Sequence, residues 1–147
     1  MIESSPNPRL AQALTYAGTL PLIGCALLAW TRSAPGVDAA GIGIAYAAII
    51  ASFISGIHWA ASLFFSPRCG YSPLIVSNVI ALAAWISVLL GDALWACLLL
   101  ALCFVSLLIL DRRLHAQAVL PTWFYRLRRN ATMIVVSLLL LMALAQR

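Results

Sequence analysis

The sequence predicts an all-α membrane protein with five helices that cross the bilayer. Hydrophobic residues make up 64% of the 147 residues and charged residues only 9%, whereas about a quarter of a soluble domain is charged. Uncharged apolar runs recur along the chain, and several approach the roughly 20 residues that a helix needs to cross about 30 Å of hydrocarbon. The polar segments between the runs are short, so we expect one domain over residues 1–147.

The first two helices are expected over residues 13–30 and 41–65. Pro6 and Pro8 interrupt any helix in the preceding tail, and Pro21 predicts a kink within the first helix. The polar stretch TRSAPGVDAA separates the two runs and predicts a loop.

The later apolar runs predict three more helices, over residues 73–90, 93–110 and 131–145. Pro73 suits the first turn of a helix, and Gly91-Asp92 leaves room only for a hairpin, with Asp92 as the N-cap of the fourth helix. Residues 111–130 mix arginines with aromatic side chains, a composition typical of a segment in the headgroup plane. We therefore expect an interfacial connection before the last helix.

The arginines predict the orientation in the membrane. All nine basic side chains are arginines, and the formal net charge is +5. Seven of them fall on the N-terminal side of the five spans: Arg9, Arg68, Arg112, Arg113, Arg126, Arg128 and Arg129. The positive-inside rule then predicts a cytoplasmic N-terminus and a periplasmic C-terminus. These few flanking arginines suit lipid headgroups, and we expect no nucleic-acid partner.

The composition argues against an enzyme, a metal site or a bound cofactor. The four cysteines have neither C-x-x-C spacing nor a histidine at the distance typical of zinc ligands. One intramembrane histidine lacks the second axial ligand of a haem, and the serines near it have no carboxylate to complete a catalytic triad. We therefore expect a non-enzymatic protein.

His58 is the one histidine inside a hydrophobic run. A titratable group within a membrane helix is typical of a ligand, ion or proton site. Alternatively, its ring bonds Ser55, Ser62 or a carbonyl of a neighbouring helix and holds the bundle together. At 1.5 Å per residue, His58 lies roughly 12 Å and Asn78 roughly 7 Å from the inner face. This depth predicts an inner-leaflet cavity between the two side chains.

Further candidates for ligand binding belong to the same half of the membrane. They are Trp59, Asp111, Arg112, Trp123, Arg126 and Arg128, with Tyr71 and Trp85 as possible walls and residues 111–129 as a cap. Each also has a simpler interpretation. Asn78 would clamp helices together, Asp111 would form a surface ion pair at a helix end, and residues 123–129 would anchor the chain at the interface. His115 would be solvated.

A stripe of small residues runs along the second predicted helix. Ala48, Ser52, Gly56 and Ala60 follow one another four residues apart, which predicts close approach of another helix. His58 and its neighbouring serines lie on the order of 160–200° away on the same helix. Because one face carries small residues and another carries His58 and the serines, little of this helix is left to face lipid. We therefore expect it inside the bundle.

Four segments carry a resemblance to a known family. YAGTLPL, FISGIHWAASL, DRR and PTWFYRLR occur in this order. From Tyr16 to about Ala145 the chain resembles an uncharacterised membrane-protein family, domain of unknown function 3429, which includes bacterial inner-membrane proteins and the mitochondrial transmembrane protein 69. The resemblance implies a five-helix membrane protein and implies no activity. We expect the protein to lie in the bacterial inner membrane.

Two functions are open at this point. One is an accessory or assembly factor that joins a larger membrane complex, or a second copy of itself, through the small-residue stripe or the arginine-rich inner face. The alternative is a binder of a quinone or lipid beside His58, with Asn78 assisting and arginines holding an anionic head. Membrane lipids are partners in either case.

Overall fold

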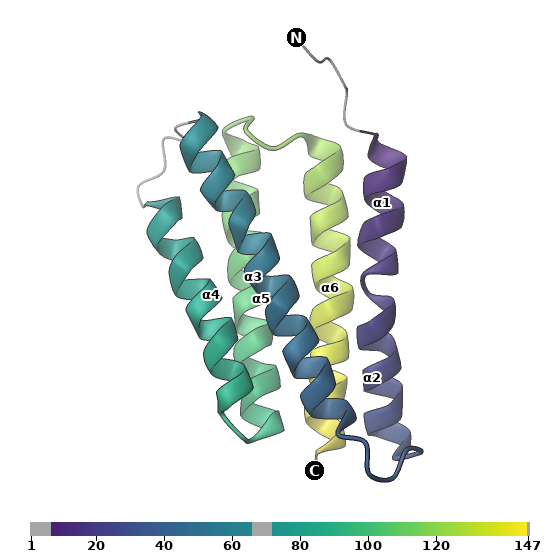
Figure 1. Cartoon of the computed structure of the whole chain (residues 1–147). Helices are drawn as coiled ribbons and strands as arrows, with labels where there is room; N and C mark the ends of the chain where they lie inside the picture. Colours follow the sequence, from purple (N-terminus) through teal and green to yellow (C-terminus); the bar gives the residue numbers. More distant parts are fainter. Residues whose placement is uncertain (1–6, 66–71, 147) are drawn as a thin grey trace.

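The computed structural model describes residues 7–65 and 72–146, and its regular secondary structure is entirely helical. The helices are α1 (Pro8–Ala17), α2 (Leu20–Thr31), α3 (Ala39–Phe65), α4 (Pro73–Leu89), α5 (Ala93–Ala116) and α6 (Thr122–Ala145). Figure 1 shows α1 and α2 end to end, and it shows that α1 begins at the end of the bundle opposite to the one where α6 ends.

The predicted class, an all-α polytopic membrane protein, is confirmed. Within residues 7–65 and 72–146, four segments are long and apolar enough to cross a membrane, and α4 is a shorter apolar helix. The four segments are Pro8–Thr31, Ala39–Phe65, Ala93–Ala116 and Thr122–Ala145. The expected cap of α5 is present, because the side chain of Asp92 accepts hydrogen bonds from the backbone N–H groups of Leu94 and Trp95.

The first span begins earlier than expected and is broken in the middle. Pro8 occupies the first turn of α1, where a missing N–H costs nothing, and Asn7 caps that turn. The kink predicted at Pro21 appears as a break between Ala17 and Leu20, because a proline cannot bond the carbonyl four residues before it. Across the bundle, the Tyr46 hydroxyl donates a 2.6 Å hydrogen bond to the Gly18 carbonyl at this break.

The connection expected over residues 111–130 is much shorter in the structure. α5 continues to Ala116 and α6 begins at Thr122, so residues 122–130 are the first turns of the last helix and not a separate interfacial segment. Ala118 turns the chain with a φ of 57°. Across this turn, Nδ1 of His115 donates a 2.9 Å hydrogen bond to the Leu120 carbonyl. The ring of His115 also stacks on Tyr125, so His115 is not simply solvated.

The core lies along α3, α5 and α6, with α2 and α4 packed at its sides. Its fully buried members are small or aliphatic side chains and one aromatic ring, including Ala26, Ala51, Leu100, Phe104, Leu107 and Leu139. Cys97 and Cys103 are buried among them, as expected for small hydrophobic side chains.

The small-residue stripe does not join helices of this chain. Ala48 is buried, but Ser52, Gly56 and Ala60 are exposed, so the prediction of internal packing by this stripe is corrected. α3 instead turns inward the face that carries Ser55 and His58. This rotation brings the His58 ring within 3.5 Å of Asp111 on α5, a neighbour that lipid does not offer.

Candidate functional site

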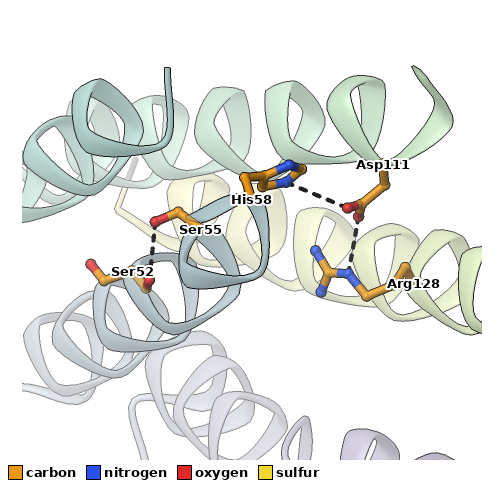
Figure 2. A network of polar contacts seen from close by, with 5 residues as sticks. All are labelled: Ser52, Ser55, His58, Asp111 and Arg128. Atoms are coloured by element: carbon orange, nitrogen blue, oxygen red, sulfur yellow. Dashed lines mark hydrogen bonds and ion pairs between the residues drawn. The ribbon is translucent and has the colours of Figure 1, made fainter. Parts of the chain in front are cut away.

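Three ionisable side chains from three helices meet inside the bundle (Figure 2). His58 comes from α3, Asp111 from α5 and Arg128 from α6; the first two are 0% exposed and Arg128 is 6% exposed. The Nε of Arg128 donates a 3.0 Å hydrogen bond to Oδ2 of Asp111. The Nε2 of His58 lies 3.5 Å from Oδ1 of the same carboxylate. Asp111 therefore links the other two groups.

The helix lengths explain how these side chains meet. Asp111 is inside α5 because this helix runs five residues beyond it, to Ala116. Arg128 is in the second turn of α6, and the short α5–α6 connection brings the two helix ends together. The site thus occupies the end of the bundle where α1 begins (Figure 1).

The ion pair balances charge but leaves several buried polar atoms without a hydrogen-bond partner. They are both ring nitrogens of His58, Oδ1 of Asp111, Nη2 of Arg128, and the hydroxyls of Ser62 and Thr132. The 3.5 Å approach of His58 to Asp111 is accordingly an electrostatic contact and not a hydrogen bond. Unpaired buried donors are costly, so this cluster holds unused hydrogen-bonding capacity.

A cavity of about 240 Å³ lies beside Arg128, between α1, α3 and α6. Arg128 and Thr132, four residues apart on one face of α6, are among its polar lining groups, and Ile54, Phe104 and Phe124 are among its apolar ones. Figure 2 shows the terminal nitrogens of Arg128 turned away from Asp111, on the side of α3.

The cavity opens at the lipid-facing surface. Its lining includes Leu14 of α1 and Phe53 of α3, whose side chains are 65% and 77% exposed. At this end of the bundle α3 leans away from α1 (Figure 1). Both rim residues belong to segments that are long and apolar enough to cross a membrane.

The structure separates several predicted site residues from this cluster. Asn78 is exposed on α4, and its amide donates a 2.8 Å bond to the Leu74 carbonyl of its own helix, so it neither bounds the cavity nor clamps two helices. Its neighbour Ser77 is the inward residue. Asp111, in contrast, is fully buried, which contradicts its interpretation as a surface helix end.

The remaining candidates lie at the margin of the site. Trp123 is half-buried, with its ring edge on Phe124, and the other three are exposed: Trp59, Arg112 and Arg126. Trp85, a predicted wall, is exposed as well, and Tyr71 lies outside the described residues.

Sequence reasoning missed Thr132 and Phe124 as lining residues. The signal for Thr132 was its spacing of four from Arg128, which places both on one helix face. Assigning Arg128 to an interfacial segment and Thr132 to a separate helix concealed that spacing.

One comparison with known proteins gives a match. The family model described as "Protein of unknown function (DUF3429)" matches residues 7–144 and so covers the ion cluster and the cavity. No curated protein and no solved structure matches the chain.

Proposed function

Because this chain belongs to the DUF3429 family, whose description gives no activity, we propose its function from the geometry of the site. It is a small, non-enzymatic integral membrane protein that binds a membrane-dissolved amphiphile, a quinone or a lipid, in the cavity beside Arg128. The polar head enters the cavity and accepts hydrogen bonds from Arg128 and Thr132. The apolar tail leaves between α1 and α3.

One observation carries this proposal: two buried donors without partners stand at a cavity that opens to lipid. Nη2 of Arg128 and the hydroxyl of Thr132 are both unsatisfied, and both residues line the cavity. Apolar walls with a few convergent polar groups are typical of small-molecule sites. A head that carries oxygen acceptors would satisfy both donors and remove their desolvation cost.

The test is the content of bound amphiphile. Protein extracted in a mild detergent is washed, and bound molecules are extracted and identified by mass spectrometry. We expect one species at near-stoichiometric amount, and we expect Thr132→Val, which keeps the shape but removes the hydroxyl, to lose most of it. Thr31→Val is the matched control, because Thr31 is exposed at the end of α2. The proposal is contradicted if the wild type and both variants carry the same amount of bound lipid, with the composition of the bulk membrane.

A second function, an accessory or assembly factor for a larger membrane complex, has its own support. The small residues Ser52, Gly56 and Ala60 are exposed on α3, and a Cβ built on Gly56 meets nothing within 4 Å. Small residues let another membrane helix approach closely.

This second function is tested by copurification after gentle extraction. Gly56→Leu should release the partner, or a second copy of the chain, whereas Gly24→Leu should not, since Gly24 is also open but lies on α2. Equal partner recovery from both variants rules out this surface.

For the location, we propose the bacterial inner membrane with the N-terminus in the cytoplasm. Supporting this, exposed arginines gather at the end of the bundle where α1 begins, including Arg9, Arg112 and Arg129, while Arg32 lies at the other end. A C-terminal alkaline phosphatase fusion should then be active and a C-terminal fluorescent-protein fusion dark. The reverse result overturns the orientation.

A further inference from the structure

The charge at the cavity is already balanced. Among the described residues that line it, only Arg128 is charged. Asp111 neutralises this positive charge, with 3.0 Å between Nε of Arg128 and Oδ2 of Asp111. At this end of the bundle the described arginines Arg112, Arg126 and Arg129 are exposed. What remains available inside the cavity is therefore hydrogen-bond donation and not net positive charge.

An anionic head would disturb the charge balance between Arg128 and Asp111. It would place a second negative charge near Asp111 in apolar surroundings, with one guanidinium shared between two anions. Burying a charge without its own counter-charge is strongly unfavourable. An uncharged oxygen acceptor meets the same donors without that cost.

The walls favour a flat head. Three aromatic side chains, Phe53, Phe104 and Phe124, line the cavity, and aromatic rings pack well against another ring. Arg128 and Thr132 project from one face of α6, so both donors can address one edge of a planar group. A volume of about 240 Å³ is below the usual size of small-molecule pockets and suits a single substituted ring with its tail outside.

From these observations we infer that the head bound in this cavity is an uncharged ring carbonyl, as in a quinone, and not a carboxylate or phosphate. This inference rests on the proposed ligand site. Arg128 and Thr132 donate to the carbonyl oxygen. Asp111 acts as a positioning residue that neutralises Arg128 and thereby selects against anions.

The experiment uses two probes on the full chain in lipid nanodiscs: decylubiquinone, which has an uncharged ring, and oleate, which has a carboxylate. Decylubiquinone binding is followed by quenching of tryptophan fluorescence, since Trp123 contacts the lining residue Phe124 with ring centroids 5.6 Å apart. Oleate is tested as a competitor.

We expect saturable quenching by decylubiquinone that oleate does not displace. Thr132→Val should weaken binding about two- to tenfold, the range expected for one lost hydrogen bond, while Thr31→Val should bind like the wild type. Asp111→Asn should make the site sensitive to oleate, because Arg128 then has no counter-charge.

The outcomes separate the inference from the proposed function. If oleate binds the wild type more tightly than decylubiquinone and Thr132→Val weakens that binding, the uncharged head is refuted and the ligand site stands. If neither probe binds and mass spectrometry finds no bound amphiphile, the proposed function itself fails. Should Asp111→Asn not fold, the comparison of the two probes on wild type and Thr132→Val decides alone.

Discussion

Replacing Arg128 by methionine removes the hydrogen-bonded cation from a carboxylate that has no access to water. Asp111 is 0% exposed and Arg128 only 6%, so water cannot substitute for the lost 3.0 Å bond. Breaking a buried ion pair on one side costs about 3–5 kcal/mol, whereas replacing both partners by apolar residues is often neutral. His58, 3.5 Å from the other carboxylate oxygen, still places one polar group beside Asp111 after the substitution. We therefore expect Arg128→Met to lower the free energy of unfolding by about 3 kcal/mol, near the lower end of this range.

Thermal unfolding in a mild detergent, followed by tryptophan fluorescence, measures this effect. At about 2–4 °C per kcal/mol for a chain of this size, Arg128→Met should lower Tm by about 6–12 °C. The double variant Asp111→Leu/Arg128→Met should lie within about 1 kcal/mol of the wild type. Arg129→Met, at the exposed neighbouring position, is the control and should change Tm little. The reasoning is refuted if the double variant is as unstable as Arg128→Met. It is also refuted if Arg128→Met and the control Arg129→Met lower Tm equally.

Three further predictions concern stability and use the same assay. Tyr46→Phe removes the 2.6 Å bond to the Gly18 carbonyl and should cost about 1 kcal/mol; a Tm equal to that of wild type would show that water or lipid satisfies this carbonyl. Asp92→Ala removes the cap of α5 and should cost about 1 kcal/mol, whereas Ser72→Ala should not, since Ser72 makes no capping bond. Gly43→Ala brings a Cβ to 2.5 Å from Met142 Cε and 3.0 Å from Cys25 Cβ and should lower the free energy of unfolding by about 1–3 kcal/mol. Gly56→Ala adds a Cβ in open space and should be tolerated. Equal losses of stability in the two variants would contradict this difference in packing.

The features that the sequence could predict are those set locally along the chain. Apolar runs of sufficient length gave the spans, and Pro73 and Asp92 marked helix starts that the structure contains. His58 stood out because a titratable residue in hydrocarbon needs a partner. Counting residues from the helix ends also placed His58 and Asp111 in the same half of the bundle.

The rotation of each helix about its axis could not be predicted in this way, because it is decided by contacts between helices. Ser77 faces the core and Asn78 does not, although they are adjacent. The DRR sequence resembled a helix end because it is charged, yet Asp111 points inward while Arg112 lies exposed. The hydrogen-bond partner of Asp111 is 17 residues away on α6, so the sequence around DRR does not reveal it.

Asp111 is synthesised before Arg128, and this order has a consequence for insertion of the protein into the membrane. Asp111 leaves the ribosome 17 residues before Arg128, so a nascent chain that ends within the α5–α6 connection carries an acid without its base. We expect the translocon to release α5 and α6 into lipid together, as a hairpin whose charges are already matched. Chains truncated before Arg128 should consequently stall at the translocon or be degraded.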